Sequence, residues 1–151
     1  METIRPTFFV TSNCHDRAPI FRNAARAELF IETLYGYRQK KIFALHEFVV
    51  MHDHVHLILT PSHLHSLERV MQFIKGGYSA VLGKGLKVRL EVWQRSFTHE
   101  NLKDRQHYGN AKRYVHENPV KKGYCQEAWL FPSSSANPRF ELDPAPSHLR
   151  G

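Results

Sequence analysis

Residues 41–61 are predicted to form two strands joined by a tight turn, and a hairpin here limits the folds open to the chain. The first segment, "KIFALHEFVVM", has the aromatic and β-branched residues typical of strands. The second, residues 54–60, follows Asp53 and is rich in Val, Ile and Leu. "HDH" supplies the turn and Pro61 ends the second strand. An antiparallel hairpin is therefore expected within the sheet.

The segments on either side of the hairpin alternate between strand and helix patterns. We expect a strand over 6–14, a helix over 23–40 capped by Asn23, a helix over 66–83, a strand within 86–97 and a helix over 101–118 that ends before Pro119. This order predicts an α+β fold of the ferredoxin-like, split βαβ type with an antiparallel sheet. The first two helices would cover one face of the sheet, which leaves the other for the third helix or a ligand.

The length of 151 residues is that of one domain. We place a single domain over residues 1–131. The segment 132–151, "PSSSANPRFELDPAPSHLRG", contains four prolines and repeated serines, which predict a flexible C-terminal tail.

Charge favours a polyanionic partner, because 21 Lys and Arg against 14 Asp and Glu give a formal net charge of +7. No apolar run approaches the roughly 20 residues of a membrane span, and no long basic amphipathic helix suggests a membrane surface, so nucleic acid is the expected partner. A basic but merely solvated surface is the alternative. The two cysteines form no CxxC pair, which favours a reduced, cytoplasmic protein. The sequence is compatible with a homodimer and does not exclude a monomer.

Two histidines stand out on the second strand of the hairpin. His54 and His56 are two residues apart, so their side chains point to the same face. Imidazole nitrogens bind divalent metals, but two ligands are too few for a site. One alternative is that one ring packs on the sheet while the other faces water. Another is a structural zinc site completed by Cys14 or Cys125.

The third predicted helix offers further partners. Tyr114 and Asn118 are four residues apart, so they share one helix face. The amide oxygen of Asn suits Mg²⁺ or Mn²⁺, and a phenolic oxygen can attack phosphorus and hold a covalent phosphate. The alternatives are a core aromatic for Tyr114 and a helix-end residue for Asn118.

Several motifs together resemble those of single-tyrosine HUH transposases. "MHDHVHLILT" is similar to their "MPDHVHLLL" signature, and "AKRYVHENPVKKGY" is similar to the "RYIxxNPVKAGL" segment of the REP-associated tyrosine transposase branch. "VWQRSFTHENL" and "EAWLFPSSS" resemble the "VWQRRFF" and "WPWSS" segments. The motifs follow the order of the family and span roughly residues 5–135. His52 departs from the pattern, where Pro or Asn is usual.

The resemblance implies a role for each matching residue. His54 and His56 would bind the divalent metal, Mg²⁺ or Mn²⁺, with Asn118 as the third ligand and Tyr114 as the nucleophile. The implied activity is metal-dependent cleavage of single-stranded DNA and strand transfer through a 5′-phosphotyrosine, with hairpin DNA such as repeated extragenic palindromes as the partner. A non-catalytic nucleic-acid-binding protein that keeps the fold is the alternative. The candidates for phosphate contacts are Lys75, Lys84, Lys87, Arg89, Arg95, Lys121 and Lys122.

Overall fold

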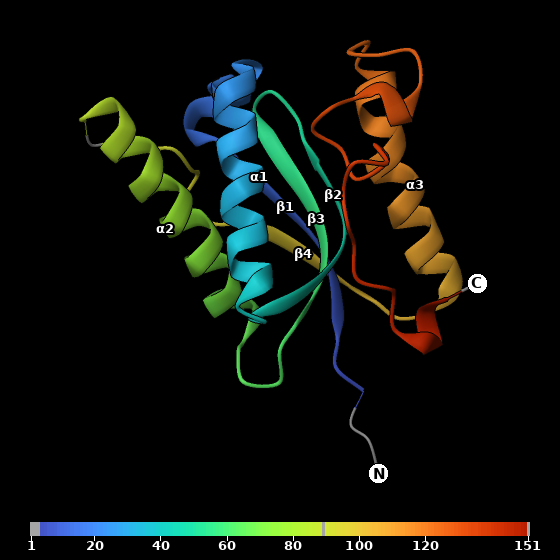
Figure 1. Ribbon diagram of the computed structural model, residues 1–151. Helices are drawn as coiled ribbons and strands as arrows, with labels where there is room; N and C mark the ends of the chain where they lie inside the picture. Colours follow the sequence, from blue (N-terminus) through green and yellow to red (C-terminus); the bar gives the residue numbers. More distant parts are fainter. Residues whose placement is uncertain (1–3, 89, 151) are drawn as a thin grey trace.

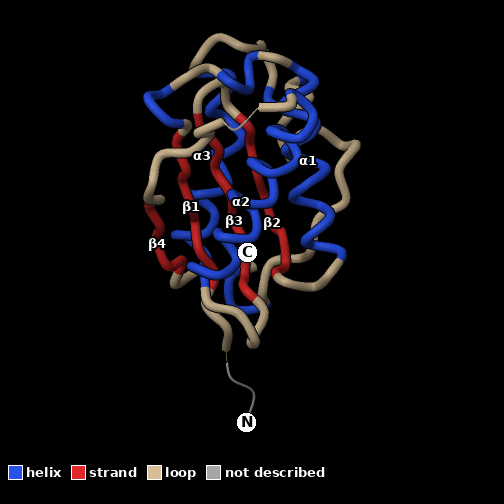
Figure 2. The backbone as a smooth tube through the Cα atoms, turned by 90° about the vertical axis from the view of Figure 1, so that its left-hand side faces the viewer, coloured by secondary structure: helices blue, strands red, loops and turns tan. Residues whose placement is uncertain are grey.

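The computed structural model describes residues 4–88 and 90–150. It contains one four-stranded antiparallel sheet in the order β2-β3-β1-β4, and Figure 2 shows the strands side by side in that order. The strands are β1 (Thr7–Asn13), β2 (Phe43–Val50), β3 (His54–Pro61) and β4 (Thr98–Leu102). The predicted hairpin is confirmed as β2 and β3, which pair with each other.

Three helices cover the two faces of the sheet. They are α1 (Ala24–Gln39), α2 (Leu67–Leu86) and α3 (Arg105–Lys121). In Figure 1, α1 and α2 lie on one face of the sheet and α3 lies on the other. The predicted α+β, ferredoxin-like arrangement is therefore confirmed. Within the described residues, no helix has the length and apolar character needed to cross a membrane.

Strand periodicity divides the apolar side chains between two cores. Leu57 and Leu59 of β3 point to the larger core with α1 and α2, whereas Ile58 points to a smaller core with α3. Tyr78 of α2 is fully buried in the larger core. The sheet therefore presents the even-numbered residues of β3 to α3.

The fourth strand is not where the sequence predicts it. The described residues between 86 and 97 form no strand, and Trp93 makes only an isolated bridge with Cys14. The strand is instead Thr98–Leu102, which pairs with β1 at the edge of the sheet. Only Leu102 of this strand is buried, so its polar sequence lacks the apolar alternation that identifies a strand.

Both later helices extend beyond their predicted ends. α2 continues through Gly83 to Leu86, and Lys87 ends it in the left-handed region with φ of 58°. α3 begins after the Asp104 cap, contains Pro119 and ends at Lys121. Pro119 cannot donate a backbone hydrogen bond, but it lies near the end of the helix, and Lys122 N beyond it still donates to Asn118 O at 3.1 Å.

The C-terminal segment, residues 132–150, lies along the outer edge of β2 (Figure 1). Val50 N donates to Ser133 O at 2.8 Å, and Ser135 N donates to Phe48 O at 2.9 Å. Leu149 is buried in the smaller core. This ordered packing differs from the loose tail that the prolines and serines predict, because the segment satisfies backbone groups on the free edge of β2.

Candidate functional site

The histidine pair lies on the face of β3 that α3 covers. His54 is 8% exposed and His56 is 4% exposed, and their ring centroids are 4.8 Å apart. The predicted shared face is therefore present, with both imidazoles at the interface between sheet and helix. Neither ring faces open solvent, in contrast to the alternative in which one of them does.

Each imidazole is held through its Nδ1 atom. His54 Nδ1 donates to Asp53 Oδ1 at 2.6 Å, and Arg17 Nε donates to Asp53 Oδ2 at 3.1 Å. His56 Nδ1 lies 2.8 Å from Thr11 Oγ1. Bonds of this kind orient metal-binding histidines in proteins and leave Nε2 as the available ligand atom.

The three supporting residues, Asp53, Arg17 and Thr11, were not singled out from the sequence. Asp53 directly precedes His54, so a carboxylate next to the pair was a visible signal. Thr11 is opposite His56 in the β1–β3 register. That pairing joins residues far apart in the chain, so no local pattern could reveal it.

The surroundings keep both imidazoles neutral. Burial lowers the pKa of His56 to about 3. Burial also lowers the pKa of His54, although the Asp53 carboxylate partly opposes this. Burial alone would raise the pKa of Asp53, but its hydrogen bonds with His54 and Arg17 outweigh that effect and lower it. A neutral imidazole has the free lone pair that a metal ion requires.

Tyr114 and Asn118 of α3 lie over the histidine pair. The Tyr114 ring is 5.3 Å from the His56 ring and nearly perpendicular to it, and it also contacts Phe9 edge-on. Tyr114 is 49% exposed, so it is not the core aromatic of the alternative interpretation. Asn118 is 8% exposed, and its Nδ2 lies 3.4 Å from His56 Nε2. The structure thus brings together all four residues proposed for catalysis and metal binding.

The donors available to a metal are two imidazoles and one amide. In residues 4–88 and 90–150, no three His, Cys, Asp or Glu side chains gather into a metal-binding group. Cys14 belongs to the core with α1 and α2, and burial raises its pKa to about 12. It therefore cannot complete a structural zinc site with the pair. The neutral imidazoles with their supported Nδ1 atoms fit an ion that Asn118 and a ligand phosphate would complete.

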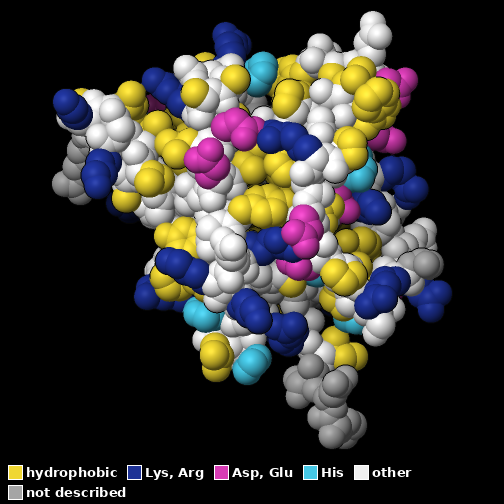
Figure 3. Space-filling model, viewed as in Figure 1, with side chains coloured by type: hydrophobic (Ala, Val, Ile, Leu, Met, Phe, Trp, Pro, Cys, Tyr) yellow, Lys and Arg dark blue, Asp and Glu magenta, His cyan; other side chains and the backbone are white. Residues whose placement is uncertain are grey.

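The predicted phosphate-binding residues do not form one surface. Lys121 ends α3 and Lys122 follows it, on the side of the sheet that carries the histidines. Lys75 and Lys84 belong to α2, across the sheet. Lys75 Nζ donates to Gln94 O at 3.0 Å. Arg95 is exposed in the segment before β4, and Arg89 lies outside the described residues. Figure 3 shows Lys and Arg dispersed over one face, with acidic side chains among them.

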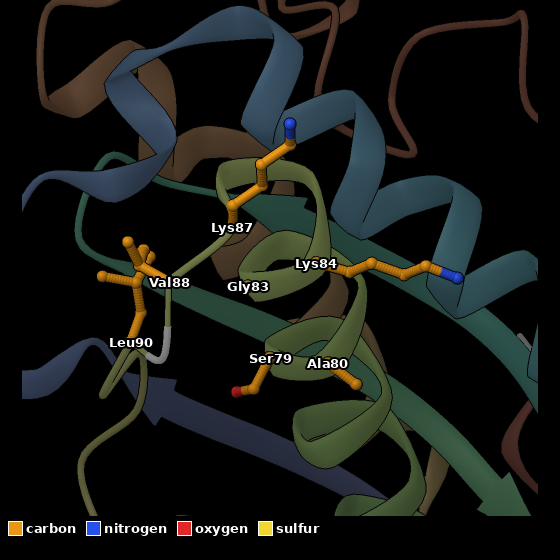
Figure 4. Close-up of a pocket in the computed structure, with 7 residues that line it drawn as sticks. All are labelled: Ser79, Ala80, Gly83, Lys84, Lys87, Val88 and Leu90. Atoms are coloured by element: carbon orange, nitrogen blue, oxygen red, sulfur yellow. The ribbon is translucent and has the colours of Figure 1, made fainter.

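A hollow of about 620 Å³ adjoins the C-terminal end of α2. Lys84 and Lys87 line it, but Figure 4 shows their side chains extending in different directions. Their amines therefore do not converge on one ligand within this hollow. It lies on the face of the sheet opposite Tyr114, which separates it from the candidate site.

Comparisons with known proteins show similarity in sequence and in fold. The family model described as "Transposase IS200 like" matches residues 8–118. The chain is similar to a solved REP-associated tyrosine transposase bound to a REP hairpin, with 22% identity, a TM-score of 0.74, and coverage of 97% of this chain and 89% of that one. It is also similar to a candidate transposase from Deinococcus radiodurans R1, with 17% identity, a TM-score of 0.59, and coverage of 78% and 92%. No curated protein matches the chain.

Proposed function

Because the chain belongs to the IS200-like transposase family, we propose that it cleaves single-stranded DNA and rejoins it through a phosphotyrosine on Tyr114. The observation that carries the proposal is the contact of the half-exposed Tyr114 phenol with His56, one of two buried, neutral imidazoles that lie side by side. The exposed side of Tyr114 leaves room for a DNA strand, while its other side contacts His56 and Phe9. A phenol so placed can attack a phosphodiester bound against the sheet.

The reaction conserves the phosphodiester linkage. The Tyr114 oxygen attacks phosphorus, and its bond to phosphorus forms as the bond to the 3′ oxygen breaks. The phenolic proton passes to water, and the leaving 3′ oxygen takes up a proton from water. The products are a 5′-phosphotyrosine and a free 3′-OH. A second 3′-OH can then attack the phosphotyrosine, which restores Tyr114 and completes strand transfer. Attack by water would only hydrolyse the DNA, so a tyrosine nucleophile favours transfer.

His54, His56 and Asn118 would hold the divalent ion that this chemistry uses. Mg²⁺ or Mn²⁺ supplies charge neutralisation at a non-bridging phosphate oxygen when it is bound. Asp53 and Thr11 orient the two imidazoles through their Nδ1 atoms. Phe9 stacks on His56 with centroids 5.3 Å apart and so restricts the tilt of that ring.

We further propose that the DNA substrate contains a hairpin beside the cleaved strand. The similar REP-associated transposase was solved bound to a REP hairpin, and its fold extends over nearly all of this chain. The net charge of +7 also favours binding to an anionic partner such as DNA. Lys121 and Lys122 at the end of α3 are the basic candidates on the side of the sheet that carries Tyr114.

The direct test uses hairpin DNA with a single-stranded flank, labelled at either end, with Mn²⁺ or Mg²⁺ present. Attack on phosphorus with release of a 3′-OH should leave the 3′-labelled strand attached to the protein in a denaturing gel. The 5′-labelled fragment should be released. Tyr114→Phe should abolish the adduct and still bind the DNA, because only a hydroxyl is lost.

Tyr108→Phe is the matched control, because Tyr108 lies on the same helix but is buried against the sheet. It should form the adduct. An undiminished adduct in Tyr114→Phe would contradict the assignment of the nucleophile. Binding with no adduct under either metal would instead favour the non-catalytic, DNA-binding alternative.

A further inference from the structure

A buried carboxylate lies beneath α3, on the side of the helix away from the histidine pair. Glu47 of β2 is 5% exposed. Its Oε1 accepts hydrogen bonds from His116 Nε2 at 2.6 Å and Ser135 Oγ at 2.7 Å. Lys112 Nζ, one turn before His116, lies 3.8 Å from Oε2. One side chain thus links β2, α3 and the C-terminal segment.

A β-bulge directs Glu47 to this position. The β2–β3 register shifts between Leu45 and Glu47, which pair with the consecutive residues Leu59 and Ile58. Leu45 and Phe48 therefore point to the core with α1 and α2, while Glu47 points to α3. Strict alternation would have placed Glu47 on the same face as Leu45, in an apolar core. Bulges commonly re-aim a side chain in this way beside functional sites.

Helix geometry relates the hydrogen bond between His116 and Glu47 to the position of Tyr114. Successive residues are separated by about 100° around the axis. Val115 is fully buried and faces the sheet, so Tyr114 and His116 lie on its two flanks. Tyr114 points toward His56 and Phe9, and His116 points toward Glu47. A rotation of α3 about its own axis over Val115 would therefore move both residues together.

The two flanks of α3 are held differently. On the Tyr114 flank, the contacts with the sheet are ring packing against His56 and Phe9, and a 3.4 Å approach of Asn118 to His56. A bond between His107 and Glu100, at 3.0 Å, is largely exposed and contributes little. The opposite flank has one short hydrogen bond, from His116 to the buried Glu47 carboxylate, and bonds to a charged group are strong and directional.

We propose that Glu47 is a positioning residue for Tyr114, acting through His116 to set the rotation of α3 over the sheet; this rests on the proposed function of Tyr114. Ser135 holds the carboxylate from behind, because its Oγ donates to Glu47 and accepts from Phe48 N at 2.9 Å. About 10° of rotation displaces an atom on the helix surface by about 1 Å. A misplacement of that size can slow catalysis by about 100-fold.

Glu47→Leu and Glu47→Gln separate positioning from packing. Leucine fills the buried space without an acceptor, whereas glutamine keeps an oxygen that can accept from His116 and Ser135. We expect Glu47→Leu to slow single-turnover formation of the DNA adduct by about 100-fold with an unchanged dissociation constant for the hairpin. Glu47→Gln should restore most of the rate. Glu100→Ala, which removes the exposed partner of His107, is the matched control and should retain the wild-type rate.

His116→Ala is the second variant and removes the same bond from a partly exposed position, so it tests the proposal even if Glu47→Leu does not fold. A wild-type rate in a folded Glu47→Leu or His116→Ala protein would overturn the proposal. So would an equal loss in Glu47→Gln and Glu47→Leu.

A measurement without DNA tests the positioning role of Glu47 separately from the proposed catalytic role of Tyr114. NMR cross-peaks between the rings of Tyr114 and Phe9 report the rotation of α3 directly, since these rings are 5.8 Å apart. Weakened cross-peaks in His116→Ala, with intact peaks in Glu100→Ala, would support positioning even if the wild type forms no adduct. Unchanged cross-peaks would refute it.

Discussion

The ring of His52 stacks on the ring of Tyr124, with centroids 3.8 Å apart and planes inclined by 13°. His52 belongs to the turn between β2 and β3, directly before Asp53. Tyr124 follows α3, and its N–H donates to Pro119 O at 2.9 Å. The stack therefore connects the turn that leads to the histidine pair with the end of the helix that carries Tyr114.

Tyr124→Ala should loosen the C-terminal end of α3, because it removes a stacked ring pair whose contribution is typically about 0.5–1.5 kcal/mol. Hydrogen exchange at the amides of residues 118–122 should become faster. Tyr124→Phe keeps the ring and should exchange as the wild type does. Equal exchange in Tyr124→Ala and Tyr124→Phe would show that the stack does not hold the helix end.

Removal of the metal should stop the reaction without unfolding the protein. The three proposed ligands are neutral, and the cores contain no metal-dependent element among the described residues, so a chelator should abolish the adduct while circular dichroism stays unchanged. His56→Ala should cost about 1–2 kcal/mol, because the ring is buried, and should form no adduct with Mg²⁺ or Mn²⁺. Cleavage in excess chelator would exclude a role for the metal.

Salt dependence should distinguish the basic residues on the two faces of the sheet. Each contact with a phosphate of single-stranded DNA adds roughly −0.7 to the slope of log K against log salt concentration. Lys122→Gln, at the end of α3, should reduce the slope by about this amount. Lys84→Gln, on α2, should leave it unchanged. Equal slopes for both variants would place the DNA elsewhere or across both faces.

Asp143 attaches the C-terminal segment to α1 and β2, and low pH should weaken this attachment. Burial alone would raise the pKa of Asp143, but hydrogen bonds from Arg38 and from Leu45 N, at 2.8–3.0 Å, outweigh it and lower the pKa. A carboxyl with a depressed folded-state pKa stabilises the protein above its unfolded-state pKa of about 3.9. This stabilisation is lost as the pH falls from that value through the folded-state pKa.

Asp143→Asn should therefore lower the free energy of unfolding at pH 7 by about 1–2 kcal/mol. The difference from the wild type should shrink at pH 3, which lies below the unfolded-state pKa of about 3.9, because the carboxyl then gains its proton when the protein unfolds. Urea unfolding at the two pH values measures both quantities. A difference that is the same at pH 3 and pH 7 would show that the carboxylate charge is not responsible.

The elements that local patterns could predict are those whose side chains alternate between a core and solvent or between two cores. The helix over 23–40 begins at its predicted Asn23 cap, whose side chain accepts from Arg26 N. The strand carrying His54 and His56 was also predicted, because a period of two is local. β4 was misplaced because an edge strand with one buried residue has no apolar pattern.

By itself, the sequence determined the order of elements and two pairs of neighbours. His54 and His56 share a strand face, and Tyr114 and Asn118 share a helix face, because each relation depends only on the backbone geometry of a few consecutive residues. Only the tertiary structure decided that the two pairs meet, that Thr11 supports His56, and that a bulge turns Glu47 toward His116. These relations depend on strand register and on the packing of segments far apart in the chain, where no local periodicity applies.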